Sequence, residues 1–424
     1  MISKIKNFLK KPFLTSIIIL SGGSLLAQGI NFVCSMIMTR EYSKDAIGYY
    51  TYILSIVTMF STVINGRYDV PIVSSEDEKE TWSLVKCSFY ISLFVSAVVT
   101  IVTYIAYGLK NSDFGGNTFL LLFVFPMLVI YGLINILNGY NNKYAEYKLI
   151  SSAYLVRTVF QNIFTIGLGV ISPSAFNLLL SQTIGLGFGI KRQCKKLIPN
   201  LKEIKAVSVG EMKSTLKKYI AQPLVSVPSS FINALSYSSI SLFVGNLFGM
   251  NLLAMYSISV RVLGIPLGIF STNIAKIHLK DASDEIDQNG NFKKCTLKMI
   301  GFSAVLSSLM VLFLMLLAPI LFGLLYGEDW IESGVYVQIL APMFGLRLIV
   351  GAVGFSFILA NKQKQELFYQ ILLFVGMAVL AIISSLCNWN IKQFLISISI
   401  CYSLIYLLEL LQIIKCSKAM VKQI

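Results

Sequence analysis

The sequence has little charge for its length. Only 13% of its 424 residues are Asp, Glu, Lys or Arg, whereas 56% are hydrophobic and the mean hydropathy is +0.74. Soluble domains carry about 25% charged residues, which they need to cover their surface. The deficit excludes a soluble protein of this size, and the high hydrophobic content excludes a disordered, fibrous or collagen-like chain. A polytopic membrane protein is the class that remains.

Residues for catalysis and metal binding are also scarce. The chain has one histidine, His278, and seven cysteines without a C-x-x-C spacing. It contains no G-x-S-x-G, H-E-x-x-H or P-loop motif, and no predicted outer loop is longer than about ten residues. The sequence therefore predicts no enzyme, no catalytic residues, no metal site and no disulfide framework.

What the sequence has instead is a series of long apolar stretches. Because about 20 apolar residues are needed to cross the hydrocarbon core, we predict an all-α polytopic membrane protein with twelve spans. The spans lie at 13–39, 47–66, 82–109, 117–138, 149–172, 174–190, 219–248, 252–275, 299–326, 334–360, 367–387 and 393–414. The fifth and sixth are joined by a single turn at Ser172-Pro173.

The cations are distributed unequally between the two sides of these spans. With both termini placed in the cytoplasm, 28 of the 35 Lys and Arg lie on the inner side, 4 on the outer side and 3 within spans. Positive charge marks the cytoplasmic loops of membrane proteins. The bias therefore predicts cytoplasmic termini and explains the net charge of +15 without nucleic acid as a partner. The basic amphipathic segment 2–11 is expected to lie on anionic membrane lipids.

The two halves of the chain repeat a pattern. Pro126 in the fourth span precedes Asn142 at its end, and Pro342 in the tenth span precedes Asn361 in the same way. Six spans in each half predict two parallel lobes, related by a pseudo-twofold axis along the membrane normal. The predicted domains are an N-lobe at 1–190, a basic cytoplasmic linker at 191–218 and a C-lobe at 219–424.

Three arginines lie within predicted spans, where a charge costs at least about 2.5 kcal/mol and usually faces a cavity or a partner. Arg261 and Arg347 lie near the middle of spans eight and ten. The small residues on their helix faces, which leave room for a ligand, are Ser257, Gly264 and Gly268 beside Arg261 and Gly351 and Gly354 beside Arg347. The alternative is close helix packing on glycine, with the arginine capping a carbonyl or paired to Glu409. Arg157 lies about two turns into span five, where it either binds a ligand or reaches the inner interface.

Acidic residues are nearly missing from the same interior, where Glu409 is the only carboxylate between the membrane edges. Exporters of cationic drugs generally need acidic groups in the cavity. Arginine binds phosphate oxygens in a bidentate manner, so the expected cargo is anionic, such as a phosphate-bearing lipid. The candidate substrate-binding residues are Arg261, Arg347 and Arg157, together with Gln28 and Asn31 on one face of the first span.

Three segments resemble those of a known family. They are Thr39–Tyr42 leading to Ile47–Tyr50, Gly66–Val73 followed by the acidic Glu76–Glu80, and Val260–Phe270. Together with the two six-span halves and the basic linker, they resemble the polysaccharide repeat-unit flippases. That family belongs to the superfamily shared with the multidrug and toxin extrusion transporters and the peptidoglycan lipid flippase.

The resemblance implies a transporter in the bacterial inner (plasma) membrane. It would move undecaprenyl-diphosphate-linked oligosaccharide from the cytoplasmic to the outer leaflet by alternating access. Arg261 matches a cavity-lining arginine of the peptidoglycan lipid flippases, which implies contact with substrate. Twelve spans rather than fourteen favour O-antigen, capsule or exopolysaccharide units. The resemblance also implies a polysaccharide polymerase and a chain-length regulator as partners. H⁺ or Na⁺ exchange, or the membrane potential, would drive transport without any other cofactor.

Three further charged residues are candidates for gating. Arg40 ends the first span on the outside, where its alternative role is an interfacial anchor, and Arg67 and Asp69 follow the second span. Because residues two positions apart do not face each other along a helix, Arg67 and Asp69 are expected to have separate partners. Two other functions stay open at this point. One is a multidrug or cation antiporter of the same superfamily, and the other is a membrane polysaccharide polymerase or glycosyltransferase.

Overall fold

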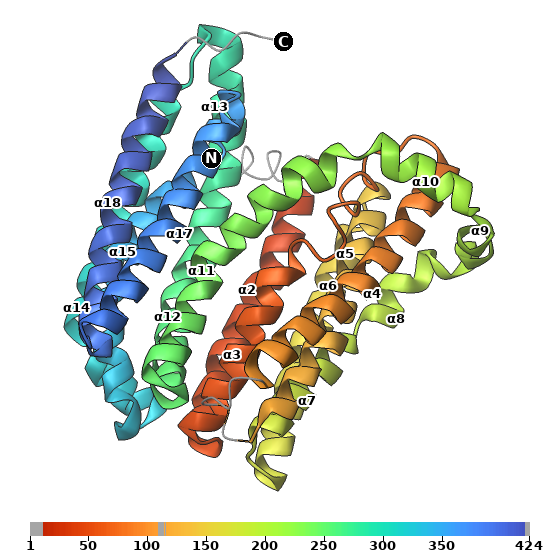
Figure 1. Ribbon diagram of the computed structural model, residues 1–424. Coiled ribbons are helices and arrows are strands. Elements are labelled where there is room, and N and C mark those ends of the chain that lie inside the picture. The colour runs from red at the N-terminus through yellow and green to blue at the C-terminus, as the bar shows by residue number, and fades with distance from the viewer. Residues whose placement is uncertain (1–11, 109–113, 115, 420–424) are drawn as a thin grey trace. The chain divides into compact units, whose positions relative to one another are not determined.

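The computed structural model describes residues 12–108, 114 and 116–419. Within these residues all regular structure is helical (Figure 1), which confirms the predicted all-α class. The helices pack into two compact units, unit 1 (Met1–Ala234) and unit 2 (Leu235–Ile424). The predicted lipid-binding segment 2–11 lies outside the described residues.

Unit 1 consists of long helices joined by short turns (Figure 1). Its helices are α2 (Pro12–Glu41), α3 (Lys44–Ser61), α4 (Glu78–Gly108), α5 (Val124–Lys143), α6 (Tyr147–Ile171), α7 (Ala175–Gly187), α8 (Ile190–Gln193), α9 (Leu201–Ala206) and α10 (Val209–Lys218), and α11 (Val227–Phe248) continues into unit 2. The predicted turn at Ser172-Pro173 is the break between α6 and α7. There Ser174 caps α7 by accepting a hydrogen bond of 3.2 Å from the Asn177 N–H.

Unit 2 is arranged around α15, which packs against α12, α14 and α18. Its helices are α12 (Met250–Pro266), α13 (Thr272–Asn289), α14 (Lys293–Tyr326), α15 (Ile331–Ala352), α16 (Ser356–Leu359), α17 (Gln363–Leu386) and α18 (Ile391–Lys418). A π-helical turn at Leu267–Ser271 joins α12 to α13 without a break. The turn directly follows Pro266, which has no N–H to donate to the helix, so the regular hydrogen-bond pattern is interrupted there.

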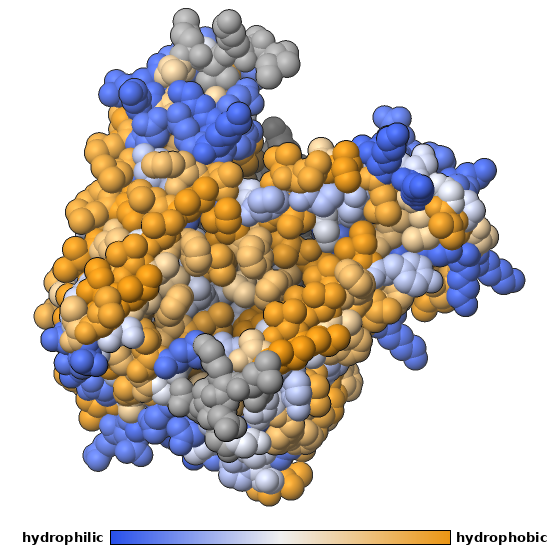
Figure 2. All heavy atoms as spheres, viewed as in Figure 1, coloured by the Kyte–Doolittle hydropathy of each residue, from blue (hydrophilic) through white to orange (hydrophobic). Residues whose placement is uncertain are grey.

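Nine helical segments within the described residues are long and apolar enough to cross a membrane. The other three predicted spans fall on α2, α3 and α7. Figure 2 shows hydrophobic side chains along the middle of the unit 2 helices and hydrophilic ones at their two ends, as expected for helices that lipid surrounds. The chain is a multi-pass membrane protein. The total of twelve spans and the cytoplasmic placement of both termini stay predictions.

The segment predicted as an interlobe linker, 191–218, is folded onto unit 1. Leu197 and Ile204 are buried in one hydrophobic cluster with Trp82 of α4 and Tyr140 of α5. The segment is therefore held by the same kind of apolar packing as the membrane helices beside it. The division between the units falls later in the chain, inside α11.

The two helices that carry the repeated prolines are followed by the same kind of turn. Ala145 follows α5 with a φ of 54°, and Asn361 follows α15 and α16 with a φ of 55°. Few non-glycine residues take a positive φ. A positive φ at Ala145 and Asn361, which lie at the same distance from Pro126 and Pro342, supports the predicted internal repeat.

Candidate functional site

Arg157 lies inside unit 1 on α6, with only 7% of its surface exposed. Its Nε and Nη2 are buried, and neither has a hydrogen-bond partner among the described residues. These two nitrogens form one edge of the planar guanidinium group, which can pair with two oxygens of a phosphate or carboxylate. The burial favours the ligand-binding alternative over the one in which this side chain extends to the inner interface.

Tyrosines surround the Arg157 guanidinium. Tyr131 of α5 and Tyr154 of α6 lie close enough to interact with it electrostatically. Tyr50 of α3 faces Tyr131 and donates a hydrogen bond of 3.3 Å to Gln182 Oε1 of α7. Among the described residues, no carboxylate pairs with Arg157. Tyr131 and Tyr154 thus lie beside the cation, and Tyr131 is in turn linked to Tyr50 of α3 and through it to Gln182 of α7.

The two polar residues predicted on the first span have different environments. Asn31 Oδ1 accepts a hydrogen bond of 2.7 Å from Asn162 Nδ2 of α6, which also donates to the Thr158 carbonyl at 2.8 Å. Gln28 Oε1 is buried and accepts no hydrogen bond from the residues that the structure describes. Asn31 therefore joins α2 to α6 in this structure, whereas the Gln28 amide oxygen is available to a ligand.

Arg347 lies half-buried on α15 of unit 2, against an aromatic face. Its Cζ is 3.7 Å from the centroid of the Tyr237 ring and 5.6 Å from that of Phe344. A guanidinium stacked on a ring in this way is stabilised by a cation–π interaction. The predicted alternative, an ion pair with Glu409, is not formed among the described residues.

Further tyrosines complete the cage around Arg347. Tyr256 of α12 and Tyr402 and Tyr406 of α18 also act on it electrostatically. Tyr402 OH donates a hydrogen bond of 2.7 Å to the Ser236 carbonyl of α11. The hydroxyls of Tyr406 and Tyr237 are hydrogen-bonded at 3.2 Å. These bonds tie three of the four tyrosines to one another or to the backbone of α11.

Glu409 is 9% exposed on α18. It faces Glu366 in the first turn of α17 and interacts electrostatically with Tyr369. Within the described part of the chain neither carboxylate forms an ion pair. The acidic groups and Arg347 are therefore separate features of unit 2.

Arg261 of α12 is half-buried and, among the described residues, forms no hydrogen bond or ion pair. The predicted room beside it exists, because a Cβ at Gly264 would meet nothing within 4 Å. The expectation is wrong for Gly351, which lies beside Arg347. A Cβ there would collide with Ser271 Oγ, so this glycine serves close helix packing.

The candidate gating residues lie outside regular helix or at helix ends. Arg40 is exposed in the last turn of α2, as an interfacial anchor would be. Arg67 has a φ of 61° and follows Gly66 with a φ of 60°. Burial raises the pKa of Asp69, and the nearby Arg67 guanidinium opposes that rise. The expectation of separate partners assumed a continuing helix, whereas α3 ends at Ser61. Among the described residues, Arg67 and Asp69 form no ion pair with each other.

The tyrosines are the residues that the sequence analysis did not select. The chain has 21 of them, so no single one stands out by composition. The internal repeat contains the missing signal, because Tyr131 follows Pro126 by five positions and Arg347 follows Pro342 by five. An alignment of the two prolines equates a tyrosine of one cluster with the arginine of the other.

Comparisons with known proteins agree with this architecture. Residues 37–335 match the sequence profile of a family described as polysaccharide biosynthesis protein. No curated protein sequence matches the chain. Among solved structures, the chain is similar to the lipid II flippase MurJ in an inward closed conformation, with 15% identity, a TM-score of 0.70, and coverage of 94% of this chain and 87% of that one. It is also similar to an inward-facing multidrug resistance MATE family transporter of the MOP superfamily, with 13% identity, a TM-score of 0.67, and coverage of 95% and 100%. At these identities the similarity concerns the fold.

Proposed function

The chain belongs to the polysaccharide biosynthesis protein family, and on this basis we propose that it is a lipid-linked oligosaccharide flippase. Its substrate is an undecaprenyl-diphosphate-linked repeat unit for O-antigen, capsule or exopolysaccharide. It moves this unit from the cytoplasmic to the outer leaflet of a bacterial inner membrane by alternating access. A polysaccharide polymerase and a chain-length regulator are its proposed functional partners.

The unpaired edge of Arg157 is the observation that carries the proposal. A buried donor without a partner costs about 1–3 kcal/mol, and more when it is charged. Binding of a ligand that supplies a pair of anionic oxygens to this isolated cation is therefore favourable. A diphosphate group supplies such pairs, and the Gln28 amide oxygen can accept from a sugar hydroxyl of the same ligand.

Arg347 and Arg261 add two cations to unit 2 that lack an acidic partner within the described residues. We propose that they bind the anionic part of the same class of substrate. Arg347 would do so through the guanidinium edges that its stacking on Tyr237 leaves unpaired. A negative-inside potential adds up to about 2.3 kcal/mol per 100 mV for each negative charge that moves outward. The potential can therefore drive transport, alone or together with H⁺ or Na⁺ exchange.

A multidrug or cation antiporter is the second candidate function. The specific observation in its favour is the pair formed by Glu366 and Glu409, which has no cationic partner among the described residues. Replacement of Glu409 by Gln would abolish drug resistance in such an antiporter. In the flippase that we propose, surface polysaccharide would persist in a Glu409→Gln strain at normal membrane potential.

The decisive experiment is deletion of the gene, followed by location of the lipid-linked oligosaccharide with a membrane-impermeant reagent. We expect complete, unpolymerised single units on the inner leaflet, and restoration of polysaccharide by the wild-type gene. Single units on the outer leaflet would instead identify a polymerase. Normal polysaccharide with increased drug sensitivity would identify an antiporter.

A further inference from the structure

The segment 191–218, which we name the basic collar, has more charge than membrane topology requires. It contains nine Lys and Arg against two Glu. The other long segment predicted inside, 276–298, contains five Lys against four Asp and Glu. Orientation depends on the number of Lys and Arg, and acidic residues have little influence on it. The five lysines of segment 276–298 are therefore enough to keep that segment inside. The larger number of cations in the basic collar, with few acidic residues beside them, calls for another explanation.

Hydrogen bonds fix the backbone of the basic collar to unit 1. Lys86 Nζ of α4 donates to the carbonyls of Lys205 and Val207 at 2.9 and 2.7 Å. Tyr68 OH donates to the Leu216 carbonyl at 3.1 Å. The cations of the basic collar therefore project from a fixed scaffold rather than from a flexible tether.

The packing also sets the depth of the basic collar along the membrane helices. Its buried residues contact Trp82, which lies in the second turn of α4, and Tyr140, which lies in the last turn of α5. At a rise of about 1.5 Å per residue, both lie within about one turn or two of the helix ends. The cation bias places these ends on the inner side. The basic collar thus lies beside the helices at the depth of the inner headgroups.

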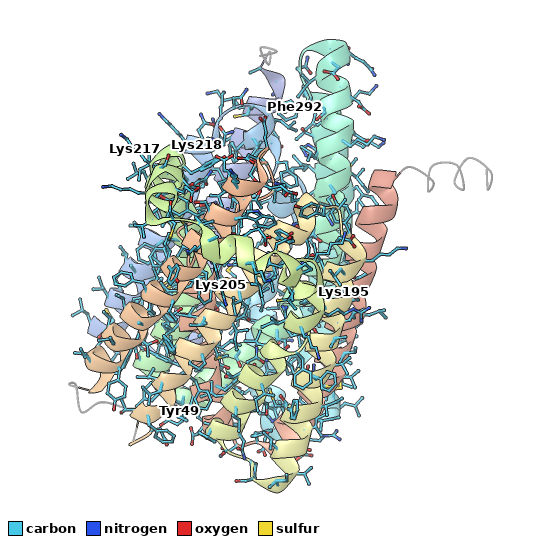
Figure 3. The ribbon with its side chains drawn as sticks, turned by 90° about the vertical axis from the view of Figure 1, so that its right-hand side faces the viewer. Tyr49, Lys195, Lys205, Lys217, Lys218 and Phe292 are labelled. Carbon is cyan, nitrogen blue, oxygen red and sulfur yellow. The ribbon has the colours of Figure 1, made fainter. Side chains whose placement is uncertain are left out.

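The outer surface of the basic collar combines cations with apolar side chains. Two of its lysines have acidic partners, since Lys196 pairs with Glu146 and Lys218 pairs with Glu80. The other seven cations are exposed and form no ion pair within the described residues; they are Lys191, Arg192, Lys195, Lys202, Lys205, Lys213 and Lys217. Figure 3 labels Lys195, Lys205, Lys217 and Lys218 along its length.

Exposed aliphatic residues lie between these cations. Ile198 is 53% exposed, Leu201 41% and Val209 80%. Alternation of lysine with exposed aliphatic side chains is typical of segments that lie in the membrane interface, where the cations meet headgroups and the apolar groups meet acyl chains. An acidic protein surface would match the charge but would leave these apolar side chains without a complementary environment.

We propose that the basic collar binds the headgroups of anionic phospholipids in the inner leaflet and so anchors unit 1 at that surface. The site is separate from the arginine clusters and does not depend on the identity of the transported molecule. A basic residue near an anionic membrane surface raises lipid binding about fivefold. This attraction should weaken with salt, because the Debye length falls from about 10 Å at 0.1 M to about 3 Å at 1 M.

The test uses the full-length protein, reconstituted in phosphatidylcholine vesicles that contain a minor fraction of phosphatidylglycerol. After mild detergent extraction, the phosphatidylglycerol that stays with the protein is measured by mass spectrometry. The variant K191Q/K202Q/K213Q removes three unpaired collar lysines. The matched control K293Q/K294Q/K298Q removes three lysines from the segment 276–298. We expect enrichment of phosphatidylglycerol with wild type and with the control, and a fall of at least about fivefold with the collar variant.

Equal enrichment in the collar variant and wild type would overturn the proposal, as would an equal loss in both triple variants. Loss of an acidic cytoplasmic protein from the collar variant, with phosphatidylglycerol retained, would mean that the collar is a protein-docking surface instead. Should the triple variant misfold, a salt titration of wild type still decides the question, since enrichment that is unchanged at 1 M salt contradicts a charge-based site.

Discussion

Unit 1 and unit 2 each place an arginine among tyrosines, but they compensate its charge differently. In unit 2 the face of the Arg347 guanidinium is stacked on the Tyr237 ring. In unit 1 the Nε and Nη2 edge of Arg157 is buried and has no hydrogen-bond partner in the described part of the chain. The first arrangement compensates the charge in part and leaves the half-buried edges of the guanidinium open to a ligand. The second leaves donors unpaired until a ligand binds, which makes Arg157 the better candidate for the primary contact with an anion.

The internal repeat relates the two clusters. Tyr131 and Arg347 occupy the same distance from the repeated proline. Tyr50 and Tyr256 are each the seventh residue of their helix, α3 and α12. Tyr50 faces Tyr131, and Tyr256 faces Arg347. The aromatic setting is thus shared by both units, whereas the cation is carried by α15 in unit 2 and by α6 in unit 1.

The largest effect should come from a change that keeps the charge of Arg157 but removes its paired donors. Arg157→Lys leaves a single ammonium group, which cannot bind two oxygens in a bidentate manner. Loss of a buried, charged hydrogen-bond partner costs about 2–5 kcal/mol, so we expect transport to fall about thirtyfold or more. The rate of appearance of lipid-linked units on the outer leaflet measures this effect. The matched variant Arg347→Lys should retain more activity, and the reverse order would contradict our comparison.

Stability should respond with opposite signs in the two units. Arg157→Met replaces a buried, unpaired cation by an apolar side chain, so we expect a gain of about 1–3 kcal/mol in the free energy of unfolding. Arg347→Met removes a cation–π contact, so we expect a loss of about 0.5–2 kcal/mol. Thermal unfolding of both variants in the same lipid would show a higher and a lower Tm, respectively. Two shifts of the same sign would mean that the arginines are equivalent.

The stacking of Arg347 on Tyr237 can be measured with a double-mutant cycle. We expect Arg347→Met and Tyr237→Leu to couple by about 1 kcal/mol, because each change removes one partner of the same contact. Tyr237→Phe keeps the ring and serves as the control with little coupling. Additive effects of the two changes would show that the ring does not stabilise the guanidinium.

The smallest effects should come from substitutions of Gln28 and Asn31 on α2, which we expect to differ in their influence on transport. Asn31→Leu removes a helix–helix hydrogen bond worth about 0.6 kcal/mol, and transport should continue. Gln28→Leu removes an unpaired amide oxygen, so transport should fall while stability is unchanged or higher. Parallel measurements of Tm and transport check the pair. Full transport in the Gln28 variant would restrict the site in unit 1 to Arg157 and its tyrosines.

Local patterns predicted much of the fold. The turn at Ser172-Pro173 is where α6 ends and α7 begins, since proline and a capping serine act on their immediate neighbours. The prediction failed near Arg67 and Asp69, where it assumed a continuing helix although α3 ends at Ser61 and the positive φ values of Gly66 and Arg67 belong to the turns that follow. It also failed for Gly351, whose neighbour Ser271 comes from another helix and could not be identified from spacing along the chain.

By itself the sequence determined that this protein is expected in a membrane, because the scarcity of charge is a property of composition. It also determined the expected orientation, because the placement of the cations is a property of residue order. It also identified Arg157, Arg261 and Arg347 as charges in an apolar environment. Only the tertiary structure decided which of these charges is compensated by a neighbouring side chain. The partner of a buried charge comes from other helices, as Tyr237 of α11 does for Arg347 of α15, and their approach is set by packing.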